Sequence, residues 1–226
     1  MKGSKEAQVH YKLGVSYYNE GSRASALKEL MRASELANRD KNIINALGLV
    51  YLSLDEFKEA VVKFQRAVEL DPEFSEAHNN MGVAYLKMED YDNAIDEFGK
   101  AVSNILYATP ERAYNNVGWA YYKKGMYAAS LENYEKSLKY STSFVLPRYN
   151  IGLIYFDKKD YRRALAQFKR LVKDYPEYAE ARLKLGLTYL KLKKRRLALE
   201  QFKTIIKDGQ NDDVVIEAER YVELFK

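Results

Sequence analysis

Apolar side chains recur along the chain at helical spacing and with a fixed long period. Six glycines mark the register, at intervals of 34, 34, 36, 34 and 34 residues: Gly14, Gly48, Gly82, Gly118, Gly152 and Gly186. Each follows an apolar residue and precedes a tyrosine by three residues, a small residue by twelve and a large apolar residue by sixteen. Small residues let two helices approach closely, and large ones fill the space between them. The pattern predicts six helical hairpins, at 7–40, 41–74, 75–108, 111–144, 145–178 and 179–212.

One further helical pattern follows the last hairpin. The residues that fall on its apolar face are Val214, Ala218, Tyr221, Val222 and Phe225. An array of hairpins needs a terminal helix to cover its last apolar surface, so we expect a capping helix over residues 213–226. Asp212 or Asp213 is the expected N-cap of that helix, because a carboxylate accepts hydrogen bonds from the first free amides.

The repeat resembles the tetratricopeptide repeat (TPR), in which Leu-Gly-x-x-Tyr, Ala-x-x-x-Phe and a proline recur over 34 residues. The match covers residues 7–212, and Pro72 and Pro176 stand at the proline position. The resemblance implies an all-α fold: an α-α superhelix (solenoid) of six TPR hairpins plus a C-terminal capping helix. Residues 1–226 would then form a single array.

The chain departs from the family pattern in two ways. Four residues before each glycine, other side chains replace the consensus tryptophan: His10, Ile44, His78, Tyr114, Arg148 and Arg182. We expect both histidines to pack or cap, since helices two repeats apart cannot share a metal. The second departure is a two-residue insertion near 103–109. Thr109 is its expected N-cap and Pro110 the first helical residue. The insertion either shifts the superhelix locally or is a harmless loop.

Composition and motifs argue against an enzyme. Cysteine is absent and histidine occurs twice, which excludes thiolate chemistry and leaves little for a metal site. The sequence contains no glycine-rich phosphate loop, no His-Glu zinc motif and no Ser/His/Asp set. The adjacent carboxylates Asp96 and Glu97 are expected on a solvated helix face. No apolar run approaches the length of a membrane span. We therefore expect no catalysis, cofactor or metal.

Charge is distributed unevenly along the chain. Residues 1–110 contain 13 basic and 17 acidic residues, whereas residues 111–226 contain 24 and 15. The basic residues crowd the turns inside the last three hairpins: Lys123 and Lys124; Lys158, Lys159, Arg162 and Arg163; and residues 191–196. Such a ridge could meet anionic lipid headgroups or an acidic partner; alternatively it is a solvated edge that keeps the array soluble. No aromatic residues interleave with it, so nucleic acid is not expected.

In this family the first helix of each hairpin lines a concave face, where positions 2, 5, 9 and 12 of the repeat point inward. Position 9 holds Val15, Leu49, Val83, Trp119, Leu153 and Leu187, and position 12 holds Tyr18, Leu52, Leu86, Tyr122, Phe156 and Leu190. A continuous apolar stripe of this size indicates a binding groove, unless curvature makes part of it core. Trp119, with Tyr122 and Tyr149 beside it, is the candidate anchor.

Asparagines form a second pattern on the same helices. They are Asn45, Asn79 and Asn115 at position 5, and Asn80, Asn116 and Asn150 at position 6. Each amide both donates and accepts, so a column of them can hold an extended peptide backbone. The alternative is a simple surface preference of these helices. The asparagine after the glycine, which chaperone-binding repeats need for their carboxylate clamp, is replaced by Val15.

The middle of the chain resembles more narrowly the type IV pilus biogenesis/stability lipoproteins, the PilF/PilW/Tgl group of pilotins. The residues that carry this likeness are 107–118, Ala129 and 134–138, together with the longer connection after the third repeat. The resemblance implies an outer-membrane lipoprotein facing the periplasm that binds the secretin subunit. The lipobox cysteine of that group is absent, so this hypothesis requires a signal and lipid anchor removed from the N-terminus.

The first hypothesis is therefore a non-enzymatic, pilotin-like scaffold whose concave apolar groove binds a secretin segment. The alternative is a cytoplasmic TPR adaptor that grips an extended peptide of an assembly partner through its asparagines. A third class, an enzyme regulator, would bind acidic partners through the basic ridge, and its binding would weaken steeply with salt.

Overall fold

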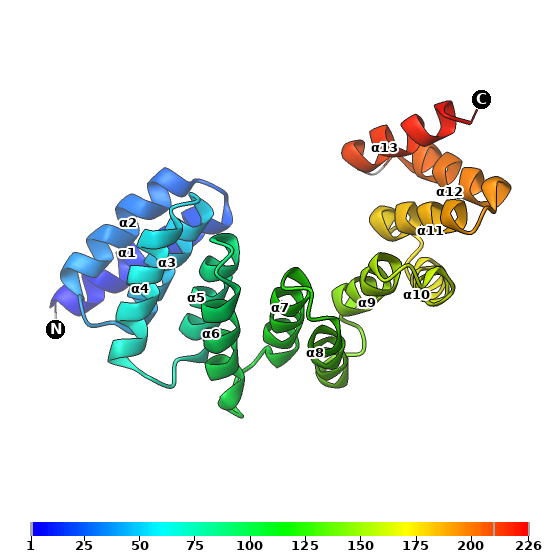
Figure 1. The fold of residues 1–226 in the computed structure, drawn as a ribbon. Coiled ribbons are helices and arrows are strands. Elements are labelled where there is room, and N and C mark those ends of the chain that lie inside the picture. Colours follow the sequence, from blue (N-terminus) through cyan, green and yellow to red (C-terminus); the bar gives the residue numbers. More distant parts are fainter. Residues whose placement is uncertain (1, 210, 226) are drawn as a thin grey trace. The chain divides into compact units, whose positions relative to one another are not determined.

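The computed structural model describes residues 2–209 and 211–225, with the side chains of residues 5–209 and 211–225, and the described part contains thirteen α-helices (Figure 1). The helices are α1 (Lys2–Asn19), α2 (Arg23–Leu36), α3 (Lys41–Ser53), α4 (Phe57–Leu70), α5 (Ser75–Lys87), α6 (Tyr91–Ser103), α7 (Pro110–Lys123), α8 (Tyr127–Tyr140), α9 (Val145–Asp157), α10 (Tyr161–Asp174), α11 (Ala179–Lys191), α12 (Arg195–Asp208) and α13 (Asp212–Glu223). The all-α prediction is confirmed. None of these helices is long and apolar enough to cross a membrane.

The helices group into two compact units. Unit 1 ends at Met126 and contains α1–α7, and unit 2 begins at Tyr127 and contains α8–α13. The division falls inside the predicted fourth hairpin, between α7 and α8. The single array over residues 1–226 and its hairpin boundaries stay a prediction.

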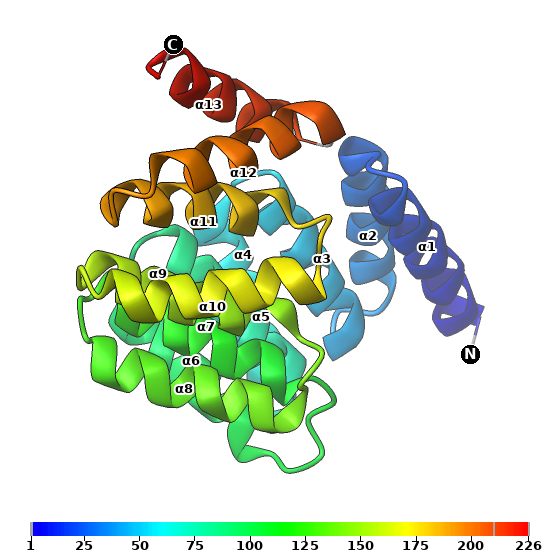
Figure 2. The same cartoon turned by 90° about the vertical axis from the view of Figure 1, so that its right-hand side faces the viewer.

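Within unit 1, successive helices pack against each other in chain order. The first helices of the hairpins, α1, α3, α5 and α7, also contact one another in a row. In unit 2, α9–α12 pack in the same order, and α13 lies against α11 and α12 (Figure 2). Val214 and Ala218 of α13 are buried, and Tyr221 and Val222 pack on the same core. The predicted capping helix is thus present and covers the last hairpin of unit 2.

The repeat glycines allow the two helices of a hairpin to touch. A Cβ added to Gly48, Gly82, Gly152 or Gly186 would lie 2.4–2.7 Å from a ring carbon of the phenylalanine sixteen residues later. Those phenylalanines, Phe64, Phe98, Phe168 and Phe202, are completely buried. Gly14 approaches the shorter Leu30 in the same way. The recurring glycine is therefore required by close packing between the paired helices.

Each hairpin turns through one residue with a left-handed backbone. At the same repeat position stand Gly21, Asp55, Glu89, Gly125, Lys159 and Lys193, with φ between 59° and 79°. The next residue donates its amide to the carbonyl of the repeat tyrosine, as Asp90 does to Tyr85 over 2.9 Å. This 6→1 bond is the Schellman ending of a helix, which favours glycine at the left-handed residue. Four of the six turns nevertheless use a residue with a side chain.

Three of the residues that replace the consensus tryptophan, His78, Arg148 and Arg182, hydrogen-bond to a backbone carbonyl six residues back. Nε2 of His78 lies 3.0 Å from the carbonyl oxygen of Pro72, six residues back. Arg148 and Arg182 donate to the carbonyls of the equivalent residues, Thr142 and Pro176, over 2.9 and 2.8 Å. In these three repeats the residue four before the glycine (position 4 of the repeat) therefore caps the turn that leads into its own hairpin. The predicted capping role of His78 is confirmed.

Of the two N-cap predictions, the one for α13 is wrong, and the one for α7 is right in position but not in its hydrogen bond. The N-cap of α13 is Asn211, whose Oδ1 accepts from the amide of Val214 over 3.3 Å, rather than Asp212 or Asp213. Thr109 stands at the N-cap of α7, but its side chain makes no capping bond there and instead hydrogen-bonds Tyr107. Pro110 opens α7 as expected.

Candidate functional site

The two apolar columns of unit 1 are half-buried. The column at position 9 consists of Val15, Leu49, Val83 and Trp119, and the column at position 12 consists of Tyr18, Leu52, Leu86 and Tyr122. Tyr18 packs on the core of the first hairpin, Leu52 on that of the second and Leu86 on that of the third. Each of these side chains therefore packs against the core on one side and is accessible to solvent on the other. The stripe is neither a fully open groove nor plain core.

A pocket of about 380 Å³ opens on this stripe, where α1, α3 and the start of α5 meet. Three predicted site residues line it together: Tyr18, Asn45 and Leu49. They come from successive first helices, because the repeat places position 12 of one hairpin next to positions 5 and 9 of the next. The lining combines a phenol, an amide and apolar surface, which suits an apolar side chain carried on a polar backbone.

The pocket also contains residues that sequence reasoning did not select. Tyr11 and Asn42 stand at the inward positions 5 and 2, and Glu76 stands at position 2 of the next hairpin. Reading all four inward columns, rather than the two apolar ones, would have found them. Phe74 had no such signal, because it lies in the turn between α4 and α5.

Phe74 is held in place by a charged neighbour. Nζ of Lys41 lies 4.5 Å from the centre of the Phe74 ring, and it also forms an ion pair with Asp71. The hydrogen bond from Lys41 holds the pKa of Asp71 below its usual value. The pocket wall formed by this turn is therefore fixed before any ligand arrives.

The asparagine column is only partly assembled for binding. Asn80 Nδ2 donates to Asn45 Oδ1 over 3.1 Å, so these two amides bridge α5 and α3. Asn79 is half-buried, and its Oδ1 is buried without a hydrogen bond from the described residues. Asn115 and Asn150 are only 7% and 8% exposed, and Asn116 is half-buried. Of the predicted asparagines, Asn45 alone lines the pocket, where Asn19 and Asn42 accompany it.

Trp119 and Tyr122 form an aromatic step on α7. Their ring centroids are 5.0 Å apart with an angle of 26° between the planes. Both rings are half-buried. Stacked aromatic rings with one accessible face are typical anchors at protein interfaces. Trp119 is thus partly accessible, and its role as an anchor stays a prediction.

The other four predicted site residues lie on unit 2: Tyr149, Asn150, Leu153 and Phe156. Tyr149 packs against Tyr178, with ring centroids 5.4 Å apart, and Leu153 and Phe156 pack on the core of the unit. Burial raises the pKa of Tyr149 and raises that of Tyr178 to about 12, so both phenols are neutral at pH 7. This part of the stripe presents an uncharged aromatic surface. Whether all sixteen residues act as one groove stays a prediction.

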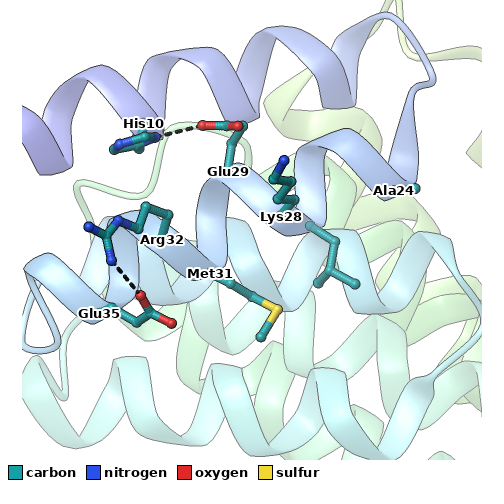
Figure 3. Close-up of a pocket in the computed structure, with 8 residues that line it drawn as sticks. His10, Ala24, Lys28, Glu29, Met31, Arg32 and Glu35 are labelled. Atoms are coloured by element: carbon teal, nitrogen blue, oxygen red, sulfur yellow. Dashed lines mark hydrogen bonds and ion pairs between the residues drawn. The ribbon is translucent and has the colours of Figure 1, made fainter.

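A larger pocket, of about 750 Å³, lies on the outer face of the first hairpin (Figure 3). Its lining comes from α2 and from His10 of α1, and it is mostly charged at the rim. His10 Nδ1 lies 2.6 Å from Glu29 Oε2, and Arg32 donates to Glu35 over 3.1 Å. The polar groups that the figure joins by dashed lines thus already satisfy one another. Met31, 45% exposed, is the main apolar group here.

Among the residues that the structure describes, no group of three His, Asp or Glu could hold a metal ion. Glu97 does not lie on a solvated face as expected. It is 7% exposed and pairs with His78 and Lys100 at 2.6 and 2.8 Å, because the histidine at position 4 needs an anion beside it. Its buried carboxylate therefore has a structural partner.

Three family profiles match the sequence. One, described as TPR repeat, matches residues 48–89, and two, described as tetratricopeptide repeat, match residues 73–143 and 149–213. The chain belongs to the tetratricopeptide repeat family. TPR repeats imply a scaffold for protein–protein interaction, and such families are typically non-enzymatic. No curated protein sequence matches the chain.

Solved structures share the fold of this TPR chain at low sequence identity. PilF of Pseudomonas aeruginosa superimposes with a TM-score of 0.79 at 18% identity, over 97% of this chain and 100% of its own. PilW, described as a widely conserved type IV pilus biogenesis factor, gives 0.84 at 17% identity, over 93% and 97%. YrrB, described as a TPR protein with an unusual peptide-binding site, gives 0.60 at 21% identity, over 84% and 97%. The chain thus resembles pilus biogenesis factors in fold.

Proposed function

We propose that this TPR chain is a pilotin-like assembly factor of a type IV pilus, and that its concave apolar face binds an extended segment of the secretin subunit. The observation that carries the proposal is the pocket formed by Tyr18, Asn45 and Leu49 on the half-exposed stripe of unit 1. The likeness in fold to PilF and to PilW, a type IV pilus biogenesis factor, is consistent with a role in pilus biogenesis.

An extended segment would bind through two kinds of contact. An apolar side chain enters the pocket, where Tyr18 and Leu49 remove it from water and Phe74 closes one end. The amides of Asn45 and Asn80, held together at 3.1 Å, lie where they can donate to and accept from the backbone of the segment. A second aromatic contact at Trp119 would fix the direction of the segment. No bond is made or broken, so the activity is binding alone.

The proposal includes a location. A pilotin acts in the periplasm at the outer membrane, and we place this protein there, attached through a lipid anchor on the natural chain. Fractionation of cells that express the complete gene tests this directly. Recovery of the protein with the outer membrane supports the pilotin proposal, and recovery only from the cytoplasm contradicts it.

The binding site is tested by a paired substitution in cells that assemble the secretin. Leu49→Asp places a charge in the pocket and should abolish secretin multimers in the outer membrane. Val62→Asp introduces the same charge on α4 at a position that is 61% exposed and lies outside the groove, and it should leave multimers at the normal level. Normal multimers in the Leu49→Asp strain, with the protein present at its usual amount, would rule out this pocket.

A second candidate function is that of an adaptor in the cytoplasm that holds an extended peptide mainly through its amides. The Asn45–Asn80 bridge favours it, and the likeness to YrrB is consistent with it. The two candidates differ in what Asn45→Ala does. An adaptor of this kind should lose its partner, whereas a groove that acts mainly through apolar contacts should retain most of its affinity. Because the chain contains one tryptophan, Trp119 fluorescence can follow the titration.

A further inference from the structure

Unit 2 has one strongly basic edge. It is formed by the α9–α10 turn and the α11–α12 turn, which lie at the same side of the unit together with the C-terminal end of α13 (Figure 2). Residues 157–163 and 191–196 contain nine basic and two acidic residues. The basic side chains, all exposed, are Lys158, Lys159, Arg162, Arg163, Lys191, Lys193, Lys194, Arg195 and Arg196. We call this set the basic edge.

Part of the basic edge lies at the amino ends of helices, where positive charge is electrostatically unfavourable. Helices α10 and α12 have no acidic residue in the first turn, where α10 carries Arg162 and Arg163 and α12 carries Arg195 and Arg196. The amino end of a helix carries a partial positive charge, so cations there are unfavourable. Helices α4 and α6 of unit 1 instead carry Glu59 and Asp92 in the first turn. The N-cap Asp160 and two ion pairs offset part of this positive charge, and an anionic partner would relieve the remainder.

Only part of the positive charge is neutralised within the chain. Arg163 pairs with Asp160 at 3.4 Å, and Arg196 pairs with Glu200 at 3.0 Å. Among the described residues, no ion pair joins Lys158, Lys159, Lys193 or Lys194 to a carboxylate. These four lysines have mobile, hydrated point charges rather than a fixed fork of donors. They suit a surface of many anions better than one particular carboxylate.

Apolar groups accompany the cations at this edge. Leu224, which directly follows the last residue of α13, is 73% exposed. Its neighbour Phe225 stacks under the Arg195 guanidinium at 4.6 Å, and the Phe225 carbonyl accepts a hydrogen bond from Arg195. The end of the chain is thereby held beside the basic residues. Cations next to an exposed aliphatic side chain are the combination that binds the interface of an anionic bilayer.

We propose that the basic edge of unit 2 docks on an anionic lipid bilayer. The lysines and arginines meet the phosphates, and Leu224 enters the boundary between headgroups and acyl chains. The contact lies on unit 2 and the pocket of Tyr18, Asn45 and Leu49 lies on unit 1, so the contact does not depend on the secretin proposal. A protein bound in this way would remain at the membrane surface even without a lipid anchor.

The test is flotation of the full chain with vesicles. We expect the protein to float with vesicles of phosphatidylcholine mixed with phosphatidylglycerol, not with phosphatidylcholine alone, and to detach as salt is raised. The triple variant Lys191→Gln, Lys193→Gln, Lys194→Gln should lower the partition coefficient roughly tenfold or more, since each cation contributes separately. The matched control, Lys169→Gln, Lys203→Gln, Lys207→Gln, removes the same charge from exposed sites on α10 and α12 and should bind as before.

Leu224→Ser separates the apolar contribution from charge. It should weaken binding to the anionic vesicles while leaving the salt dependence in place. Equal losses in the two triple variants would show a general charge attraction and overturn the docking edge. Failure to float with anionic vesicles, combined with binding to polyglutamate, would assign the edge to an acidic protein and overturn the bilayer proposal.

Discussion

His78 and Glu97 form a buried ion pair, with His78 Nδ1 2.6 Å from Glu97 Oε2. The other ring nitrogen faces the Pro72 carbonyl oxygen at 3.0 Å. A carboxylate and a carbonyl only accept, so both ring nitrogens donate and the ring is an imidazolium. Burial lowers the pKa of His78, but the hydrogen bonds to Glu97 and Pro72 outweigh it and raise the pKa above 6.5.

The His78 pair should make stability depend on pH. Because the folded-state pKa of His78 is raised, its contribution is fully present below the unfolded value of 6.5 and is lost as pH rises through the folded value. We expect the free energy of unfolding, measured with urea, to fall as pH is raised from about 6 to about 9. His78→Gln should flatten this slope, with His10 still in place. An unchanged slope in that variant would mean that the imidazolium contributes nothing.

The repeat glycines should resist the smallest substitution. Gly48→Ala places a Cβ 2.5 Å from Cε1 of the buried Phe64, and a packed ring cannot move aside. We expect a loss of about 1–3 kcal/mol in the free energy of unfolding. Gly99→Ala is the matched control, because Gly99 lies in α6 with no atom within 4 Å of an added Cβ. It should stabilise by about 0.5–1 kcal/mol. Equal effects of the two substitutions would show that the contact with Phe64 does not decide the cost at Gly48.

The left-handed turn residues should respond in the opposite sense. Glu89 has φ 59°, a conformation that strains any residue with a Cβ. Glu89→Gly should therefore stabilise unit 1 by about 0.5–1 kcal/mol. Gly125→Ala, at the same repeat position with φ 73°, should destabilise by a similar amount. Thermal denaturation followed by circular dichroism measures both, and shifts of the same sign would contradict the assignment.

The amide bridge between α3 and α5 should couple two sites that are 35 residues apart. Asn80 Nδ2 and Asn45 Oδ1 are 3.1 Å apart. A double-mutant cycle of Asn45→Ala and Asn80→Ala should give a coupling of about 0.5–1.5 kcal/mol in the free energy of unfolding. Simple additivity would mean that the amides do not hold each other in place, and the ready-made backbone contact proposed for them would be lost.

The helices and their contacts could be predicted because packing leaves a strict trace in the sequence. A glycine sixteen residues before a phenylalanine has one physical cause, the close approach of two helices, and the structure shows that contact at Gly48 and Gly186. The capping helix could be predicted in the same way, because the apolar side chains of Val214 and Ala218 need another apolar surface to pack against. Such features depend on volume and spacing, which residue types report directly.

Polar roles were predicted less well, because several neighbours can fill them. Asn211 caps α13 although Asp212 and Asp213 are equally suitable by type. Glu97 is buried because His78 lies opposite, a pairing across nineteen residues that the local pattern does not reveal. In the pocket, Phe74 comes from a turn, where the repeat imposes no side-chain direction. The concave stripe could be located from periodicity, but its degree of burial depends on the curvature between hairpins.

Because each helix contacts mainly its neighbours in the chain, a hairpin could be gained or lost at one end of this protein without disturbing distant helices. Each helix of a unit packs mainly on its neighbours in the chain, so there is no central nucleus on which every segment depends. The exposed face of α1 illustrates this. Val9 and Leu13 are 63% and 40% exposed, while Ile43 and Leu47, their counterparts in α3, are 0% and 4% exposed against the preceding hairpin. Gene duplication could add a hairpin there without rebuilding the rest, whereas fraying at that end would remove Tyr18 and the α1 wall of the pocket.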